Sequence, residues 1–356
     1  MFEALREVQR SAGAQLSEQG LPLTFGQEAE ALAAVGTGVV VCDRTACGLI
    51  EVSDADRIRF LHNQSTNDFQ SLKSGQGCET VFVTSTARTI DLVSAYLTEE
   101  AVLLLTSPGQ DSRLIDWMDR YIFFADKVKL KNLTGAIATF SLIGPSSQAL
   151  LSQLGLAGEL EHPGSHQLAS LGEIEVRVAL GSGLALPGYT LLVPAQQAAD
   201  LWQMLVAAGA VPAGEAVWHQ LRVQQGRPVP GAELTEDYNP LEAGLWQTIS
   251  FNKGCYIGQE TIARLNTYQG VKQQLWGIRL QGDTTPGTPI MVGDDKVGVL
   301  TSLVNTAEGP LALGYIRTKA GGAGLEVTVG DATGTVVDVP FVARGYLEQT
   351  AEVSST

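Results

Sequence analysis

The chain has 356 residues, of which 44% are hydrophobic and 17% charged, and its formal net charge is −15. This length exceeds the size at which one hydrophobic core usually stops growing, so we expect two or three domains. The negative charge argues against direct non-specific nucleic-acid binding, and the lack of an apolar run near the roughly 20 residues of a membrane helix argues against a membrane partner.

The first twenty residues show a helical spacing of apolar side chains and no targeting signal. Phe2, Leu5, Val8 and Ala12 recur at helical intervals, which predicts a helix that ends before Gly20. The segment lacks the basic flank and apolar core of a signal peptide and the Arg-rich character of a transit peptide. We therefore expect a cytoplasmic location.

Two short β-branched runs and a helix follow. Residues 39–41 and 49–52 predict strands joined by tight turns, and Ser53 or Asp54 can cap a helix that begins at about residue 55. This helix ends before the polar segment 63–68, which we interpret as a loop.

The central part of the chain mixes strands and helices. Strands are predicted at 80–84, 89–98, 101–106, 136–143, 173–180 and 189–193, and helices at 111–124, 148–154 and 195–208. The glycine fingerprint of a βαβ dinucleotide site is absent from the sequence. This pattern favours an α+β body of about 265 residues.

Beyond about residue 275 the helical spacing disappears. Glycine-punctuated apolar runs at 276–280, 296–303, 311–316 and 325–329 predict short strands. They indicate an all-β module of about 80 residues, either a small barrel or a sandwich.

The most distinctive chemistry lies in residues 251–264, where two glycines bracket a single thiol. Gly254 permits a close ligand approach or a positive φ, and Gly258 permits a turn into a following helix. Lys253 and the helix start supply the kind of positive potential that raises a thiolate fraction. Cys255 is therefore either a reactive thiol or a small buried apolar residue, and the residues alone leave both open.

The other cysteines predict neither a metal site nor a disulfide framework. Cys42 and Cys47 lie across a strand–turn–strand, Cys78 has no fourth Cys nearby, and the His residues show no ligand spacing. Four Cys in a chain of 356 residues are too few for a disulfide-rich domain, so we expect all four to be reduced.

One string of eight residues resembles the K-G-C-Y-x-G-Q-E signature of the YgfZ family of folate-binding proteins, which includes a mitochondrial iron–sulfur assembly relative. Here it reads Lys253-Gly254-Cys255-Tyr256-Ile257-Gly258-Gln259-Glu260. The resemblance extends upstream through residues 221–222, 226–228 and 239–245, in a layout similar to the T-protein aminomethyltransferase of glycine cleavage. Further landmarks at 60–68, 296–302 and 311–316 spread it over nearly the whole chain.

The resemblance implies an α+β fold of two interleaved ferredoxin-like units around a central channel, followed by a C-terminal antiparallel β-barrel. The first unit would comprise residues 1–48 and 135–220. The second would comprise 49–134 and 221–270 with the signature, and the barrel would comprise 271–356. The channel would hold tetrahydrofolate or a one-carbon derivative.

Two positions bear on the choice between the YgfZ family and the T-protein. The T-protein carries an acidic pterin-binding motif before a Gly-Tyr strand, whereas residues 183–189 lack the expected Glu. Asp91 lies near the position of the essential carboxylate of the T-protein, which keeps one-carbon chemistry open. We favour its interpretation as a turn or cap residue, because Asp is common in turns.

The resemblance also implies ligand contacts, each with a structural alternative. Cys255 is the candidate catalytic thiol. The candidate folate-binding residues are Lys253, Gly254, Tyr256, Gly258, Gln259, Glu260, Arg264, Gln64, Thr66, Asp68, Asn239, Glu242 and Trp246. Tyr256 and Trp246 would either form walls of the folate site or belong to the core. Lys253 and Arg264 would bind the glutamate tail of folate, and Arg264 could instead pair with Glu260. The polar loop would bond the pterin edge or solvate a helix end, and Asn239 with Glu242 would position the signature or contact ligand.

Three functions follow from these expectations. The favoured one is a tetrahydrofolate-binding accessory protein for assembly or repair of iron–sulfur clusters in client proteins, including tRNA-modifying enzymes, with Cys255 as a transient thiol. The alternatives are a folate-dependent aminomethyl or other one-carbon transferase, and a non-catalytic adaptor that folate stabilises. We expect a monomer whose partners are folate and iron–sulfur client proteins.

Overall fold

The structure, a computed structural model, describes residues 2–348 and divides into two compact units. The first contains the chain up to Leu61 together with Phe69–Glu79 and Val93–His219. The second contains His62–Asp68, Thr80–Leu92 and the chain from Gln220 onward. The two units are therefore interleaved in sequence. The division into two α+β units and a barrel, with the boundaries given above, stays a prediction.

The first unit contains a six-stranded sheet with the order β10-β11-β12-β9-β3-β13. Its strands are β3 (Val40–Asp43), β9 (Ile137–Ile143), β10 (His166–Leu171), β11 (Ile174–Leu180), β12 (Gly188–Pro194) and β13 (Val211–Ala213). Neighbours pair antiparallel except β3 and β13, which are parallel. Segments on either side of residues 47–132 thus share one sheet.

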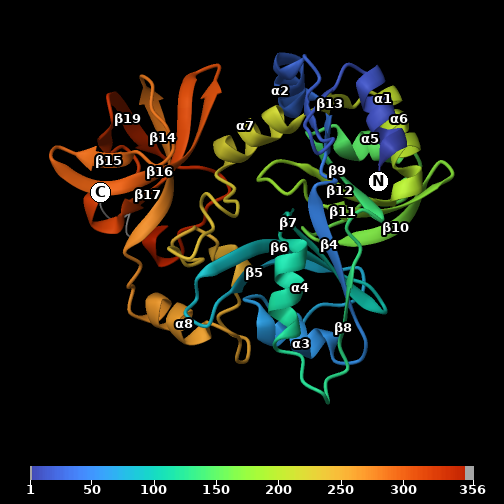
Figure 1. Cartoon of the computed structure of the whole chain (residues 1–356), viewed down its shortest axis with the longest axis horizontal. Helices are drawn as coiled ribbons and strands as arrows, with labels where there is room; N and C mark the ends of the chain where they lie inside the picture. The colour runs from blue at the N-terminus through green and yellow to red at the C-terminus, as the bar shows by residue number, and fades with distance from the viewer. Residues whose placement is uncertain (1, 349–356) are drawn as a thin grey trace. The chain divides into compact units, whose positions relative to one another are not determined.

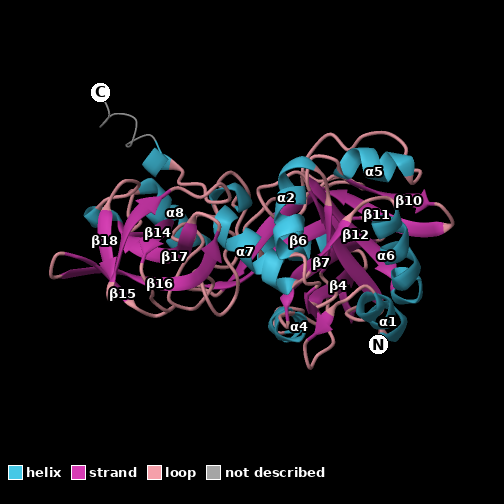
Figure 2. Cartoon of the chain, turned by 90° about the horizontal axis from the view of Figure 1, so that it is seen from above, coloured by secondary structure: helices cyan, strands magenta, loops and turns pink. Residues whose placement is uncertain are grey.

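Helices cover one face of this sheet, where α1, α5 and α6 lie beside β10–β12 in Figure 2. The helices of this part are α1 (Glu3–Ser11), α2 (Glu28–Thr37), α5 (Ser147–Gln153) and α6 (Ala198–Ala207), with a 3-10 turn η1 (Ala195–Gln197) before α6. Apolar residues of α1, α5 and α6 join those of the strands in one core around the fully buried Trp202. Burial of this apolar surface supplies the main stabilisation of the layer.

A buried polar network fixes α1 to the turn that follows β3. Arg6 forms an ion pair with Asp43, and the side-chain amide of Gln9 donates to the same carboxylate at 2.7 Å. The second guanidinium nitrogen of Arg6 donates to the hydroxyl of Thr45 at 2.6 Å. Because each buried polar group has a partner, the network avoids the cost of an unpaired charge.

A five-stranded sheet has the order β5-β6-β7-β4-β8. Its strands are β4 (Cys47–Ser53), β5 (Gly77–Val83), β6 (Thr89–Leu97), β7 (Ala101–Pro108) and β8 (Lys129–Asn132), and its helices are α3 (Arg57–Gln64) and α4 (Asp111–Asp119). Within the first unit, Leu49 and Tyr96 of this sheet pack in one cluster with Ala179 and Leu192 of the six-stranded sheet. The α+β architecture predicted for the body is confirmed.

The C-terminal part forms a closed barrel with the order β14-β17-β16-β15-β18-β19, drawn in orange to red in Figure 1. Its strands are β14 (Gln273–Gln281), β15 (Pro289–Val292), β16 (Asp295–Thr306), β17 (Gly309–Arg317), β18 (Glu326–Val329) and β19 (Ala332–Val337), with a 3-10 turn η3 (Thr318–Ala320). Before it come α7 (Glu215–Gln225), the 3-10 turn η2 (Trp246–Thr248) and α8 (Gln259–Thr267). The predicted antiparallel barrel is confirmed, and barrel closure removes exposed strand edges.

Two helices are shorter than the sequence suggests. The first ends at Ser11, because Gly13 adopts φ 92° and the chain turns into the ribbon of β1 (Gln15–Leu16) and β2 (Pro22–Thr24). The helix predicted at 111–124 ends at Asp119. Among the described residues, no helix is long and apolar enough to span a membrane.

Candidate functional site

The signature segment lies in the second unit, together with every residue predicted from it. Its turn depends on Gly258, which adopts φ 81° directly before α8. A Cβ atom at Gly258 would also lie 2.9 Å from both the carbonyl oxygen of Thr84 and a methyl carbon of Val83. Glycine is therefore required there for its conformation and for the close approach.

Lys253 holds the signature against the segment that follows α3. Its ammonium donates to the carbonyl oxygens of His62 at 2.5 Å, Asn67 at 2.6 Å and Ser65 at 2.7 Å. It also lies 4.7 Å from the centre of the Tyr256 ring. Charge-assisted hydrogen bonds and a cation–π contact thus fix this lysine in a structural position.

Cys255 is exposed, although its neighbours on both sides are held in place. The alternative that it is a buried apolar residue is therefore wrong. Gly254 is also exposed and lies outside the left-handed region, so of its two proposed uses the positive φ is wrong. A Cβ atom there would lie 3.7 Å from Nε2 of His62 and would meet no other atom within 4 Å. The thiol is accessible on a locally fixed loop.

Tyr256 and Trp246 form part of a buried cluster beneath the signature. They pack with Ala87, Leu241, Ile249, Ile262 and Val271. Burial raises the pKa of Tyr256 to about 12, so its hydroxyl stays protonated at neutral pH. The indole nitrogen of Trp246 is buried without a hydrogen-bond partner among the described residues. The structure thus places both aromatics in the core, as one alternative predicted.

The segment predicted as a polar loop begins inside α3, because Gln64 is the last residue of that helix. Its side chains differ in how they are bonded. The hydroxyl of Thr66 donates to the carbonyl of Thr248 at 2.8 Å and accepts from the amide of Val81 at 2.9 Å. The side-chain oxygen of Gln64 is buried and has no hydrogen-bond partner among the described residues. Thr66 therefore joins strand β5 to the 3-10 turn η2, whereas Gln64 retains an acceptor for a ligand.

His62 is a buried residue of this region that the sequence-based set did not include. Its Nδ1 lies 3.1 Å from the carboxylate of Asp68. Burial first, and then the Lys253 cation, lower the pKa of His62, so the ring is mostly neutral at pH 7. The nearby carboxylate favours the tautomer that carries its proton on Nδ1 and leaves a lone pair on Nε2.

Asn239 and Glu242 form a capping box rather than an open pair of ligand groups. The side-chain oxygen of Asn239 accepts from the amides of Leu241 at 3.0 Å and Glu242 at 3.1 Å, and the Glu242 carboxylate accepts from the amide of Asn239 at 3.1 Å. Burial raises the pKa of Glu242 above its usual value. This reciprocal pattern fixes the turn before Trp246.

The remaining predicted residues lie on the first two turns of α8. Gln259 is half-buried, whereas Glu260 and Arg264 are exposed on successive turns. The amide of Ile257 donates to the carbonyl of Asn63 at 3.1 Å, which adds a second link between the signature and α3. Arg264 is therefore the accessible cation of the predicted pair.

Asp91 lies within strand β6 and is fully buried. Its interpretation as a turn or cap residue is wrong, because the chain continues in extended form to Leu97. Nearby, Thr89 is held by the segment at 235–238, since its amide donates to the carbonyl of Tyr238 at 3.0 Å. Asp91 therefore stays a candidate for one-carbon chemistry, as a carboxylate inside a strand of the second unit.

A buried ion pair links α7 to the barrel and was not identified from sequence. Arg222 donates to the carboxylate of Glu233 at 3.1 Å and to the hydroxyl of Ser302 at 2.8 Å. The same carboxylate accepts from Ser302 at 2.6 Å and from Thr301 at 2.8 Å. Glu233 lies outside the segments that resemble the known family. The resemblance covers only the other participants in this ion pair, Arg222 and residues 296–302.

Possible metal ligands are the His, Cys, Asp and Glu side chains of residues 2–348. In that part of the chain no group of three or more His, Cys, Asp or Glu residues is placed to hold a metal ion. The four cysteines, all among the described residues, form no disulfide with one another; Cys42 is buried and Cys47 and Cys78 are half-buried.

The fold defines an aminomethyltransferase-like protein. It superposes on the glycine cleavage system aminomethyltransferase T from Bartonella henselae with a TM-score of 0.84 at 21% identity, covering 96% of this chain and 98% of that one. Residues 8–253 match the family described as the GCVT N-terminal domain. The chain belongs to this family, within the aminomethyltransferase superfamily.

Relatives by sequence agree with this family. The chain is 46% identical over 339 residues to a chloroplastic protein of Arabidopsis thaliana named provisionally as a transferase, covering 94% of this chain and 78% of that protein. It is 28% identical over 356 residues to an aminomethyltransferase of Mycolicibacterium paratuberculosis, covering 95% and 96% of the two chains.

Proposed function

We propose that this protein binds tetrahydrofolate or a one-carbon derivative and uses the Cys255 thiol in the assembly or repair of iron–sulfur clusters in client proteins, including tRNA-modifying enzymes. The observation that carries the proposal is the exposure of Cys255 on a loop fixed by Lys253, Tyr256 and Gly258. A thiol held in this way can meet a protein partner without rearrangement of the loop. The signature that resembles the YgfZ family supports the iron–sulfur part of the proposal.

Polar groups of the second unit support the folate part of the proposal. A pterin edge carries hydrogen-bond donors and acceptors, and Trp246 and Gln64 offer a buried donor and a buried acceptor that lack partners among the described residues. Asp91 adds a buried carboxylate for an amino-bearing ring. Arg264 is the candidate for the glutamate tail, because Lys253 already bonds three carbonyls. When bound, the folate would supply or accept the one-carbon unit.

The second candidate is a folate-dependent aminomethyl or other one-carbon transferase. The burial of Asp91 in β6 favours it, because a buried carboxylate can orient an amine or accept a proton from it. Aminomethyltransferase relatives support it too. The third candidate is a non-catalytic adaptor that folate stabilises. It requires neither Cys255 nor Asp91 for chemistry.

Complementation separates these candidates. In cells that lack the protein, we expect Cys255→Ala to abolish recovery of iron–sulfur enzyme activity and Asp91→Asn to retain it. Cys47→Ala is the matched control, because that thiol is half-buried in the first unit. If Asp91→Asn is inactive and Cys255→Ala active, the transferase is favoured. If both variants are active, the adaptor is favoured.

We further propose that the protein acts as a cytoplasmic monomer. The cytoplasmic part of this proposal is carried over from the expectation stated for the sequence, and the Arabidopsis relative is named as chloroplastic. Fractionation of cells and light scattering of the purified chain test the two parts separately.

A further inference from the structure

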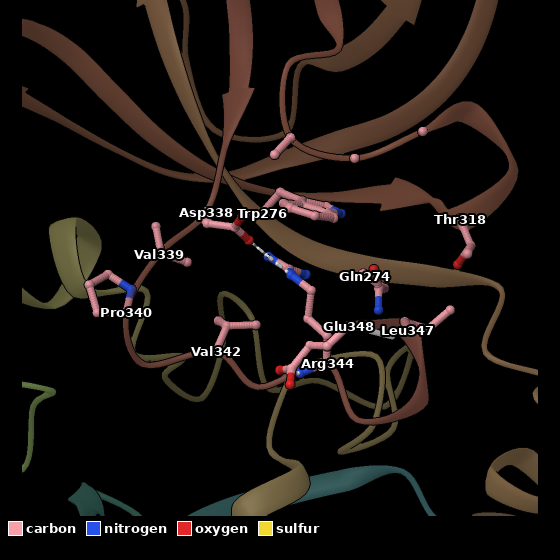
Figure 3. Close-up of a pocket in the computed structure, with 13 residues that line it drawn as sticks. Gln274, Trp276, Thr318, Asp338, Val339, Pro340, Val342, Arg344, Leu347 and Glu348 are labelled. Carbon is pink, nitrogen blue, oxygen red and sulfur yellow. Dashed lines mark hydrogen bonds and ion pairs between the residues drawn. The ribbon is translucent and has the colours of Figure 1, made fainter. Parts of the chain in front are cut away.

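A pocket of about 930 Å³ lies within the second unit, beside barrel strand β14 (Figure 3). Gln274, Trp276, Thr318, Gly322, Asp338 and Arg344 contribute to its lining. None of the residues assigned above to folate lines it. Its volume is that of a small-molecule site, which typically spans about 300–1,000 Å³.

Trp276 places a buried hydrogen-bond donor in this lining. The side chain is 6% exposed, and its indole nitrogen has no hydrogen-bond partner among the described residues. Figure 3 shows this nitrogen at the end of the indole that faces Thr318. An indole N–H can only donate, and leaving it unpaired is costly, so the site calls for an acceptor.

The charged groups of the pocket are already engaged with one another. The Arg344 guanidinium lies 3.2 Å from the centre of the Trp276 ring, and its Nε donates to the carboxylate of Asp338 at 3.0 Å, as Figure 3 shows. The backbone amide of Arg344 donates to the Glu348 carboxylate at 2.7 Å. One cation beside two carboxylates gives no surplus positive charge for an anion.

The neutral polar groups complement an amide. The side-chain amide of Gln274, which is 5% exposed, lies in the same wall and can both donate and accept. Gly322 packs directly against Trp276, because a Cβ atom there would lie 2.8 Å from the indole ring. Val339, Val342 and Leu347 add apolar surface.

We propose that this pocket binds an uncharged ligand with a planar carboxamide or lactam group on an apolar body. The ligand carbonyl accepts a hydrogen bond from Nε1 of Trp276, and the ligand N–H donates to the side-chain oxygen of Gln274. The ligand is separate from the folate of the proposed function, and its binding does not depend on that function.

Proton–nitrogen NMR of the indole groups tests this directly on the full chain. The sequence has five tryptophans, and Trp276→Phe assigns the signal of residue 276 by its loss. Benzamide is the probe, with benzoate of the same shape as the charged control. Trp202 and Trp246 also bury unpaired indole nitrogens, so their signals report any general loosening of the protein.

We expect benzamide to shift the Trp276 signal saturably with a dissociation constant on the order of 1 mM. We expect benzoate to bind about tenfold more weakly, and Gln274→Met to weaken benzamide by about tenfold through loss of one hydrogen bond. The proposal is overturned if the signal does not move at about 20 mM benzamide, or if benzoate binds equally well. A parallel shift of the Trp202 and Trp246 signals would also overturn it.

Discussion

Lys253 donates a hydrogen bond to the carbonyl oxygen of Ser65 at 2.7 Å, across a sequence separation of 188 residues. Two further carbonyls, of His62 and Asn67, accept from the same ammonium. From the sequence, Lys253 was expected to lie beside the thiol or to bind the glutamate tail of folate. In the structure it joins two segments of the second unit that are distant in sequence.

Replacement of Lys253 by Met should lower the free energy of unfolding by about 3 kcal/mol, because it removes charge-assisted hydrogen bonds to three carbonyls. Urea unfolding measures this. Lys129→Met is the matched control, since that side chain is 77% exposed and pairs only at the surface. Unchanged stability with reduced folate affinity would instead identify Lys253 as a ligand cation.

Substitution of the two signature glycines should have unequal effects. Gly258→Ala should destabilise the protein by about 2–3 kcal/mol, because the residue has φ 81° and its Cβ would approach two atoms at 2.9 Å. Gly254→Ala should change stability by less than about 0.5 kcal/mol, since the position is exposed and open. Equal losses of melting temperature in the two variants would refute this account of the turn.

Removal of one partner from the Arg222–Glu233 pair should be costly. Glu233→Gln leaves a buried guanidinium without its counter-charge, so we expect a loss of about 3–5 kcal/mol in the free energy of unfolding. Glu308→Gln breaks an ion pair whose side chains are 62% and 73% exposed, and should cost less than about 1 kcal/mol. Comparable costs would mean that burial does not control the strength of these pairs.

His166 should make stability fall in mild acid. Burial first, and then the Arg177 cation, lower its pKa from 6.5 to about 4, so the unfolded chain binds a proton in that interval that the folded chain does not. This contribution is complete above pH 6.5 and is lost as the pH falls toward 4.

Comparison with His166→Gln isolates this contribution. Between about pH 7 and pH 5 the wild-type protein should lose about 2 kcal/mol more than the variant in the free energy of unfolding. All other titratable groups are common to the two proteins, so their contributions cancel in the difference. The same loss in both proteins would show that His166 is not held neutral by the fold.

Features carried by short stretches of sequence were predicted well. The helix after Gly258 begins at Gln259, because a glycine with positive φ and a following helical spacing are local signals. The glycine-punctuated apolar runs identified barrel strands β14, β16, β17 and β18 for the same reason. Local conformational preference decided these elements.

Features that depend on distant contacts could not be read from the sequence. The partners of Lys253 are residues 62–67, so no window around the signature contains them. Asp91 resembles a turn residue in isolation, and only sheet pairing buries it in β6. Glu233 lies outside the segments that resemble the family. His62 lies in the landmark at 60–68 but was not among the candidate site residues. Burial and charged neighbours single out both residues only in the structure.

The most direct test of the account is calorimetric titration of tetrahydrofolate into the full chain and into Cys255→Ala and Trp246→Phe. We predict saturable binding to the wild type and to Cys255→Ala with similar affinity, because the thiol is exposed and its proposed role is toward a client protein and not toward folate. Trp246→Phe should bind about tenfold more weakly, through loss of the indole donor. Absence of binding to all three proteins would contradict the folate function and leave the family relationship as one of fold alone.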